Sequence, residues 1–338
     1  MDDSASLKRV EAAKISLTIE NWHDVVHIAC YYGLPVIICV GFLGGIINFI
    51  VVARHLTSSI ETYTHGLVLG TVLLLSSGAL LDLHKYIGYV QILEIIRGYV
   101  ISCKDWFWYT TIWLMVIMSL ERFLSLTSNR AKALCSPLQA GITVLMVYLV
   151  CLVSALPRFW EFQAVQQFDP RSNRTFLLSE KSKSTDTPEY NVMYFWYVTT
   201  ITIFLPHPLM LVLAILLYVS IRKSLHSKRR LSKKHSTGQV LNRKVSDEIC
   251  LTRLLIALML SYLVLTSPDI VLKLLIKVSP YTIEKGSVLF ETLTELFNTL
   301  FYFNYMLYFP FLLIYSRIYR ITCCNTFCCC CCCCDTSA

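Results

Sequence analysis

The chain has 338 residues, of which 55% are hydrophobic and 15% charged, and its mean hydropathy is +0.57. An ordinary soluble domain carries about 25% charged residues, because its surface must be solvated. This balance excludes such a domain and indicates a membrane protein.

Seven stretches contain no Asp, Glu, Lys or Arg and are long enough, or nearly long enough, to cross a bilayer. A helix needs about 20 apolar residues to do so. The stretches are residues 28–53, 63–81, 106–120, 133–157, 190–221, 254–268 and 296–316. Runs of this length are typical of helices rather than of barrel strands. The sequence therefore predicts an all-α membrane protein, a bundle of seven helices.

Charge predicts how the bundle lies in the membrane. With the N-terminus outside, the inner segments hold sixteen Lys and Arg against five Asp and Glu, a net charge of +11, and the outer side carries −3. These values sum to the +8 of the whole chain and obey the positive-inside rule. The basic balance therefore needs no nucleic acid as a partner, and membrane lipids are the expected surroundings.

The predicted organisation has three parts: an extracellular segment 1–27, a transmembrane domain 28–316 and a cytoplasmic Cys-rich tail 317–338. No cleavable signal peptide is visible, so the first span is expected to act as the targeting signal. The sequon Asn173-Arg174-Thr175 lies on the predicted outer side, which makes Asn173 a candidate for glycosylation.

Nine of the fifteen cysteines crowd the end of the chain. Seven are consecutive, and consecutive cysteines suit the tetrahedral spacing of a zinc site poorly. Acylation of Cys323, Cys324 and Cys328 is favoured over metal binding, because acyl chains re-enter the membrane just past the last span. A passive low-complexity tail is the other alternative. Neither a metal nor a cofactor is expected.

Two cytoplasmic segments have further patterns. Ile314, Ile318 and Ile321 recur at helical spacing with bases between them, which predicts a short amphipathic helix on the inner membrane surface. Residues 222–248 form a polar, basic loop. This loop is either a solvated connection that contacts anionic lipid or, in addition, a docking surface for a partner protein.

Seven spans, an outer N-terminus, an acid and Arg at the inner end of the third span and a basic third inner loop together resemble the rhodopsin-like G-protein-coupled receptors. The resemblance is carried by Asn48 in "GGIINFIVVARHL", Glu121-Arg122-Phe123 in place of Asp-Arg-Tyr, Pro268 in "LTSPDIV", and Asn304 with Tyr308 in "NYMLY", a variant of Asn-Pro-x-x-Tyr. The segments "TTIW" and "VYLVCLVSALPRFW" are most similar to orphan receptors proposed to sense aromatic amino acids or peptides.

Several positions depart from the pattern of this family. Thr266 stands where a Trp is usual, and Tyr305 stands where a proline would bend the seventh span. Counting from Asn48, the acid that the family buries in the second span falls at Ser76. This substitution places the family's sodium pocket in doubt.

The family's outer disulfide also lacks its cysteines. Counting from Arg122, the cysteine expected on the third span falls at Arg97, and residues 158–249 contain no cysteine. A bond between Cys30 and Cys103 is an alternative, since both lie near the predicted outer face.

The resemblance implies an activation switch at the inner end of the third span. Glu121 would hold Arg122 in the quiet state, and separation of the third and sixth spans would turn Arg122 toward a heterotrimeric G protein, with arrestin as a candidate second partner. A lone Arg at this depth can instead snorkel to lipid headgroups. Asn304 and Tyr308 share a helix face and serve either the switch or helix packing. Pro268 predicts a kink.

Ionisable residues in the outer half are candidates for a ligand site. They are Lys104, Asp105, Asp269, Lys273 and Glu295, with Trp108 from the aromatic "WFWY" segment beside them. Charges at this depth commonly line an aqueous cavity. Both signs with aromatic walls suit a zwitterionic amino-acid-like molecule or a short peptide. The alternative is mutual pairing, of Asp269 with Lys273 or Lys104.

The predicted function is a plasma-membrane receptor that transmits an extracellular ligand signal to G proteins and is not an enzyme. A transporter would predict inverted repeats or broken helices at the midplane, and a membrane hydrolase would need a nucleophile with a base or a metal set. None of these stands out in the sequence. The open alternative is a seven-helix protein that signals constitutively or does not couple to G proteins.

Overall fold

The protein is described from a computed structural model that covers residues 3–54, 58–88, 90–128, 136–169, 174–183, 185–232, 239–278 and 287–327. Within these ranges seven helical segments are long and apolar enough to cross a membrane. They are Trp22–Ala53, Ser59–Ile87, Gln91–Thr127, Pro137–Phe159, Pro188–Lys223, Ile249–Ile276 and Val288–Tyr315. The prediction of an all-α bundle of seven spans is confirmed.

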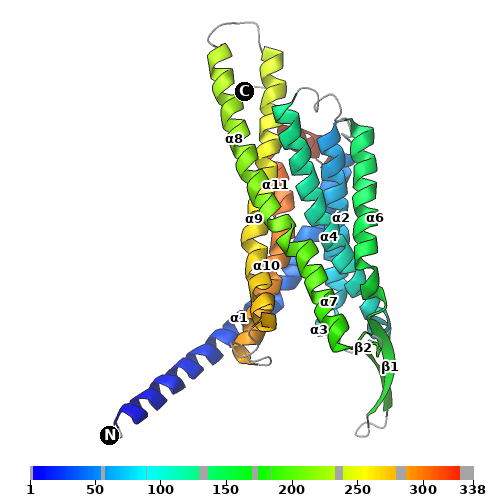
Figure 1. Ribbon diagram of the computed structural model, residues 1–338, viewed down its shortest axis with the longest axis vertical. Helices are drawn as coiled ribbons and strands as arrows, with labels where there is room; N and C mark the ends of the chain where they lie inside the picture. The colour runs from blue at the N-terminus through cyan, green and yellow to red at the C-terminus, as the bar shows by residue number, and fades with distance from the viewer. Residues whose placement is uncertain are drawn as a thin grey trace.

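The elements follow one another up and down the bundle (Figure 1). In chain order they are α1 (Asp3–Ala53), α2 (Ser59–Asp82), α3 (His84–Ile87), α4 (Gln91–Thr127), α6 (Pro137–Phe159), β1 (Phe162–Asp169), β2 (Arg174–Lys181), α7 (Pro188–Thr199), the π-helical turn η1 (Thr200–Phe204), α8 (Pro206–Ser232), α9 (Gln239–Val278), α10 (Val288–Met306), α11 (Tyr308–Tyr315) and α12 (Arg317–Phe327). The N-terminus lies at the end of the bundle that carries β1 and β2, here called the hairpin end (Figure 1). The opposite end, which carries α12, is called the α12 end.

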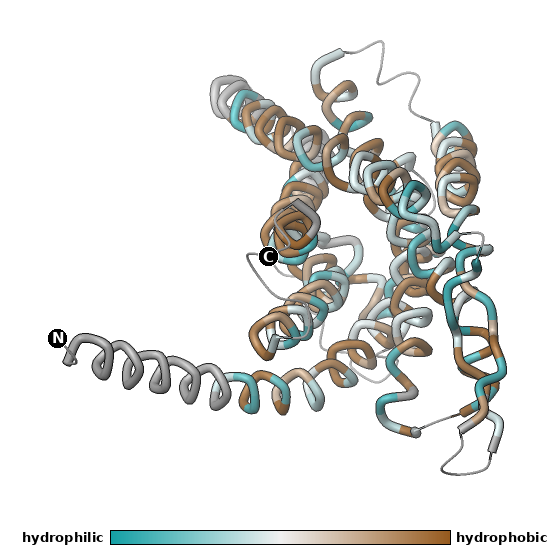
Figure 2. The backbone as a smooth tube through the Cα atoms, turned by 60° about the horizontal axis from the view of Figure 1, so that its bottom comes forward, coloured by the Kyte–Doolittle hydropathy of each residue, from teal (hydrophilic) through white to brown (hydrophobic). Residues whose placement is uncertain are grey.

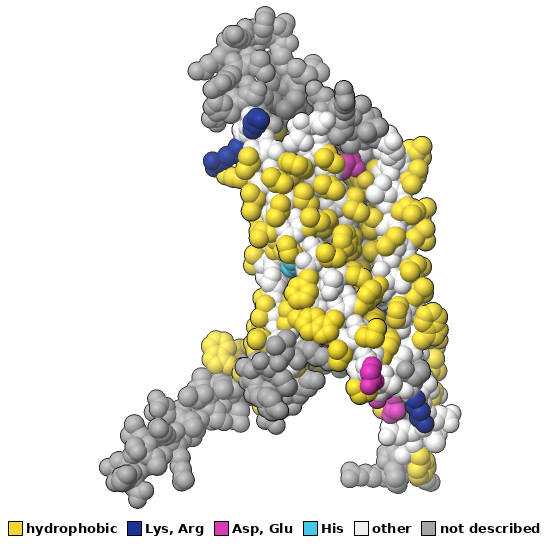
Figure 3. Space-filling view, viewed as in Figure 1, with side chains coloured by type: hydrophobic (Ala, Val, Ile, Leu, Met, Phe, Trp, Pro, Cys, Tyr) yellow, Lys and Arg dark blue, Asp and Glu magenta, His cyan; other side chains and the backbone are white. Residues whose placement is uncertain are grey.

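Apolar residues cover the sides of the bundle. Figure 3 shows hydrophobic side chains over the face between the two ends, with described charged side chains toward the ends. The interior is also largely apolar, and Leu74, Leu75 and Ile112 are fully buried. Because both the inside and the outside of the bundle are apolar, the helices follow long hydrophobic runs rather than a narrow amphipathic stripe.

Local sequence signals start several of these helices. Ser58 and Glu61 form a capping box at the start of α2, and Ser136 and Gln139 form another at the start of α6. Pro137 occupies the first turn of α6, where its missing N–H costs nothing. These caps satisfy backbone donors that a helix end would otherwise leave unpaired.

The third span is much longer than the run 106–120 predicted for it. Helix α4 has 37 residues and begins at Gln91, so Glu94 and Arg97 lie inside the helix. Their side chains form an ion pair of 3.3 Å, and Glu94 is buried against the hairpin. A charge-free criterion ended the predicted span too early because these charges have partners within the protein.

A two-stranded antiparallel hairpin joins α6 to α7, an addition to the all-α prediction. Strand β1 pairs with β2 from Phe162 opposite Lys181 to Asp169 opposite Arg174. Figure 2 shows hydrophilic and hydrophobic residues interspersed along these strands, whereas the spans are mainly hydrophobic. The strands therefore lack the continuous apolar runs that mark the spans.

The seventh span is broken near its α12 end. Helix α10 ends at Met306 and α11 begins at Tyr308. Pro310 has no N–H to donate to the carbonyl of Met306, so the regular helical ladder cannot continue through this point. This proline lies five residues beyond Tyr305, the position at which the family's pattern has its proline.

Candidate functional site

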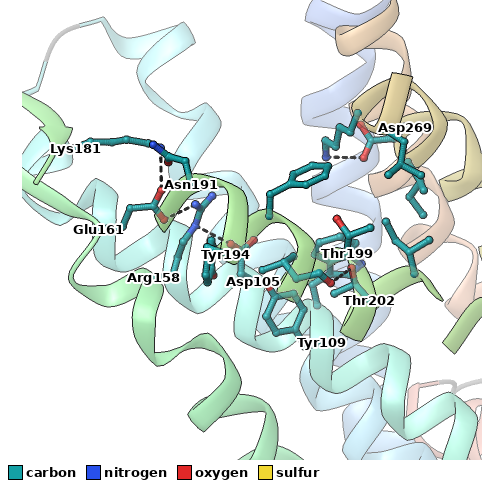
Figure 4. A pocket seen from close by; sticks show the side chains of 17 residues that line it. Asp105, Tyr109, Arg158, Glu161, Lys181, Asn191, Tyr194, Thr199, Thr202 and Asp269 are labelled. Atoms are coloured by element: carbon teal, nitrogen blue, oxygen red, sulfur yellow. Dashed lines mark hydrogen bonds and ion pairs between the residues drawn. The ribbon is translucent and has the colours of Figure 1, made fainter. Parts of the chain in front are cut away.

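A cavity of about 570 Å³ lies at the hairpin end of the bundle. Its walls come from α4, α6, β2, α7, η1, α9 and the turn that precedes β1 (Figure 4). Three acids and three bases line it, together with large aromatic side chains. These residues are Asp105, Glu161 and Asp269; Arg158, Lys181 and Lys273; and Trp108, Tyr109, Tyr194 and Phe195.

One side of this cavity is built around Arg158, at the end of α6. Its Nε lies 3.0 Å from Oδ2 of Asp105 on α4, and its Nη1 lies 2.5 Å from Oε2 of Glu161. The other oxygen of Glu161 lies 3.2 Å from Nζ of Lys181. The guanidinium also lies over the ring of Tyr194, 5.8 Å from its centroid. Two bases and two acids therefore neutralise one another along this wall.

The opposite side carries the second charged pair. Asp269 and Lys273 lie one turn apart on α9, with Oδ2 and Nζ 2.7 Å apart. Figure 4 shows Asp269 across the cavity from Arg158. This pairing is one of the alternatives that the sequence left open. The acids and bases of the cavity are therefore equal in number, and each of the two opposite walls carries both positive and negative side chains.

Two donors on residues that line this cavity make no hydrogen bond of regular geometry. They are Nε1 of Trp108 and the hydroxyl of Tyr194, and both atoms are buried. Buried polar groups are normally paired, because leaving them unpaired costs about 1–3 kcal/mol. Donors that line a cavity without an acceptor are suited to an acceptor on a ligand.

The six predicted ligand residues do not all meet here. Asp105, Trp108, Asp269 and Lys273 line the cavity. Lys104 instead lies against α10, where its Nζ is 5.0 Å from the ring centroid of Tyr302.

Glu295 also lies away from this cavity. Its Oε2 is 2.8 Å from Nδ1 of His27, and both residues line a second cavity of about 360 Å³ at the hairpin end. His27 follows His23 by four residues on α1, and the two rings stack with their centroids 5.8 Å apart. Glu295 therefore helps to tie α10 to α1 rather than to form the larger cavity.

Sequence reasoning missed Arg158, Glu161 and Lys181. Arg158 directly follows the apolar run of the fourth span, and this position could have marked it as a charged residue at the end of a span. Glu161 and Lys181 are twenty residues apart and meet only because the hairpin pairs its two strands. No local pattern reveals such a pair.

At the other end of α4, Glu121 and Arg122 are both half-buried. One turn earlier, the hydroxyl of Ser119 lies 3.0 Å from the sulfur of Met259 on α9. Because Ser119 is fully buried, α4 and α9 are packed together at this level. The predicted switch pair therefore lies beside a closed contact between the third and sixth spans.

Asn304 and Tyr308 connect the seventh span to two neighbours. Oδ1 of Asn304 accepts a hydrogen bond of 3.1 Å from Ser261 on α9. The hydroxyl of Tyr308 lies 3.4 Å from the sulfur of Met115 on α4. The two residues lie on either side of the break at Leu307. Pro268 lies inside α9, more than a turn beyond Ser261.

Asn48 is buried and accepts a hydrogen bond from the hydroxyl of Tyr319 on α12. Burial raises the pKa of Tyr319, so this hydroxyl stays protonated and donates. Asn48 also lines a small cavity with Thr71 of α2 and Tyr308. Ser76, where counting from Asn48 places the family's buried acid, is not among the residues that line this cavity, and its hydroxyl donates to the carbonyl of Val72 in its own helix.

The cysteine predictions have mixed outcomes. Cys30 and Cys103 are free thiols, so they do not form the alternative disulfide. Cys323 and Cys324 are half-buried on α12, the short helix expected after the last span. Cys328 and the predicted glycosylation site Asn173 lie outside the described residues.

Seven helices that are long and apolar enough to cross a membrane, with a cavity at one end of the bundle, define the class as a seven-helix membrane protein. The sequence matches the 7 transmembrane receptor (rhodopsin family) over residues 44–315. The chain belongs to this family. No curated protein sequence matches it.

Proposed function

We propose that this protein is a plasma-membrane receptor that binds an extracellular ligand at the hairpin end and activates heterotrimeric G proteins at the α12 end. The positive-inside charge pattern supports an outer hairpin and an inner α12. Its family supports receptor function, because members transmit signals across membranes through a seven-helix domain. Arrestin is a second proposed partner at the inner face.

The ligand class is inferred from the balanced cavity, which is the observation that carries this proposal. A zwitterionic amino-acid-like molecule or short peptide would find acids and bases on both walls and aromatic side chains between them. Its polar groups would also give acceptors to Trp108 and Tyr194. A ligand that carries only one charge would pair with the residues of opposite sign and leave their present partners in the cavity wall unpaired.

Signalling would follow from the way in which this ligand bridges α4 and α9. Those helices carry Asp105 and Asp269 at the cavity, and they meet again at Ser119 and Met259. A ligand that binds one arrangement of these helices more tightly shifts the population toward it. We propose that the favoured arrangement opens the contact of Ser119 with Met259 and releases Arg122 toward the G protein.

The test is nucleotide exchange by purified receptor in lipid nanodiscs with members of each Gα class. The probes are single aromatic amino acids and their dipeptides. At least one probe should raise exchange, and Asp269→Asn should lower its potency at least tenfold. Lys183→Gln, which changes an exposed lysine outside the cavity, should leave potency unchanged.

Two outcomes would favour the alternatives. Exchange that is high without any probe and unchanged by all of them would support a constitutively active receptor. No exchange with any Gα class, from protein that retains its fold, would contradict G-protein coupling.

The tail has a proposed role in this signalling end. Acylation of Cys323, Cys324 and Cys328 would anchor the end of α12 in the inner leaflet. The guanidinium of Arg320, which donates to the carbonyls of Leu313 and Ile314, would then lie near the lipid headgroups.

A further inference from the structure

The hairpin lies against α4 without the covalent bond that members of this family use there. The cysteine expected on the third span is replaced by Arg97, and residues 158–249 contain no cysteine. The hairpin nevertheless forms part of the cavity wall, since Lys181 of β2 lines it. Noncovalent contacts must therefore hold the hairpin in place.

The first contact is made by Glu94, one turn from Arg97 on α4. Its Oε2 accepts a hydrogen bond of 3.2 Å from the backbone N–H of Ser179 on β2. Its Oε1 is paired with Arg97 at 3.3 Å. Glu94 is only 8% exposed. A buried carboxylate that bonds a strand N–H fixes the position of β2 on α4, because charge-assisted hydrogen bonds are strong and directional.

The second contact is made by Glu161, which is 1% exposed and directly precedes β1. Its carboxylate bridges Arg158 and Lys181, so it joins α6 to the end of β2. Arg158 continues the chain of charges to Asp105 on α4. The backbone carbonyl of Glu161 also accepts an N–H from Ser182 at 2.8 Å. Glu161 therefore holds the start of β1 and the end of β2 together at the open end of the hairpin.

A glycine on α4 allows this close approach. A Cβ at Gly98 would lie 2.6 Å from Cβ of Phe162, the first residue of β1. Such a contact is too short for any side chain larger than hydrogen without movement of the strand. Gly98 lies one turn from Glu94. The close approach of Phe162 and the hydrogen bond to Ser179 are therefore made by neighbouring turns of α4.

We propose that Glu94 and Glu161 form an ionic clasp that replaces the covalent tie and sets access to the cavity. Both are positioning residues: they hold the hairpin, and the hairpin with Arg158 and Lys181 forms the cavity rim. An ionic clasp opens and closes reversibly, whereas a disulfide keeps its loop attached. The clasp acts on the hairpin and requires neither a ligand nor a G protein.

Hydrogen–deuterium exchange of the full-length protein in nanodiscs tests the clasp. Glu94→Gln and Glu161→Gln should each speed exchange of the β1 and β2 amides at least tenfold while amides of the buried part of α4 keep their protection. Glu180→Gln is the matched control, because Glu180 is an exposed acid on β2 with no ion pair among the described residues. Test variants that exchange like the control would overturn the proposal.

A second pair of variants covers the case in which a buried acid cannot be changed without loss of folding. Lys181→Gln removes one partner of Glu161 at a more exposed position, and Lys183→Gln removes a charge two residues further on. Exchange of the hairpin should rise at least threefold in the first and stay unchanged in the second. Equal exchange in both would overturn the proposal. A reducing agent that speeds hairpin exchange in the unaltered protein would also overturn it.

Access to the cavity is measured separately. Thr202 is buried and lines the cavity, so Thr202→Cys places a thiol within it. A neutral, water-soluble methanethiosulfonate should modify this thiol at least tenfold faster when Glu161→Gln is also present than when Glu180→Gln is. Equal rates would contradict the role in access, whatever the outcome of the nucleotide-exchange assay.

Discussion

At the scale of single residues, most charged side chains at the hairpin end have a partner of opposite sign, either one turn away or on another element. Arg158 faces acids on α4 and in the turn before β1. Lys104 instead lies over the faces of Phe301 and Tyr302, which attract a cation through the ring quadrupole. Removing one member of a charged pair leaves the other charge buried without a partner. Substitutions that keep the shape of the side chain and remove its charge are therefore the informative ones.

The switch pair gives the first prediction at this scale. Glu121→Gln should raise basal nucleotide exchange several-fold, because the neutral side chain holds Arg122 less tightly. Arg122→Ala should abolish probe-driven exchange while surface expression persists. Exchange assays on both variants check this. Unchanged exchange in both would mean that Arg122 only contacts lipid headgroups.

Tyr319 gives the second prediction. Tyr319→Phe removes the hydroxyl that donates to Asn48 and should lower the free energy of unfolding by about 1 kcal/mol. Thermal unfolding in detergent measures this change. Tyr315→Phe is the control, since it makes the same change in the preceding helix, at a residue whose described contacts are ring contacts. Equal effects would show that the hydrogen bond contributes nothing specific.

Gly78 gives the third. A Cβ at this position would lie 2.4 Å from Cε1 of Tyr302, so Gly78→Ala should destabilise the protein by about 1–3 kcal/mol through overpacking. Gly33→Ala is matched to it, because Gly33 is also helical and has nothing within 4 Å of the added atom. The control should leave the unfolding temperature unchanged or slightly raised. A loss of stability in both would point to backbone effects instead.

At the scale of elements, the break in the seventh span positions the residues on either side of it. Asn304 reaches α9 before the break, and Tyr308 reaches α4 just after it. The span therefore contacts two neighbouring helices within about one turn of the break.

Pro310→Ala tests this directly. The new N–H could bond the carbonyl of Met306, which should straighten the span and lower nucleotide exchange at least fivefold. Pro188→Ala is the control, since Pro188 lies in the first turn of α7, where its missing N–H has no partner to lose. Normal exchange in Pro310→Ala would show that the break is not needed for signalling.

The elements also differ in how far the sequence predicts them. The seven spans follow from composition, since long apolar runs have few other solutions in lipid. The hairpin was missed because its two strands do not alternate regularly between apolar and polar residues. The extended start of α4 was missed because Glu94 and Arg97 look like the end of a span until their partners on β2 and on α4 itself are known.

At the scale of the whole molecule, the structure holds together without disulfides among the described cysteines. Cys30, Cys39, Cys103, Cys151 and Cys250 are free thiols. Reducing agent should therefore leave the unfolding temperature of the purified protein unchanged, within measurement error. Thermal unfolding with and without reductant checks this. A clear drop would reveal a covalent bond elsewhere in the chain.

The sequence by itself determined the membrane class, the number of spans, the expected orientation and the family. Each of these depends on local composition or on motifs within one helix, such as Glu121-Arg122. Only the tertiary structure decided which charges meet, such as Arg158 with Asp105 and Glu161 with Lys181. It also decided that Thr71 rather than Ser76 lines the small cavity beside Asn48. Burial in lipid depends on the hydropathy of one segment, whereas pairing depends on how far each helix extends and how its neighbours lie, which no single segment specifies.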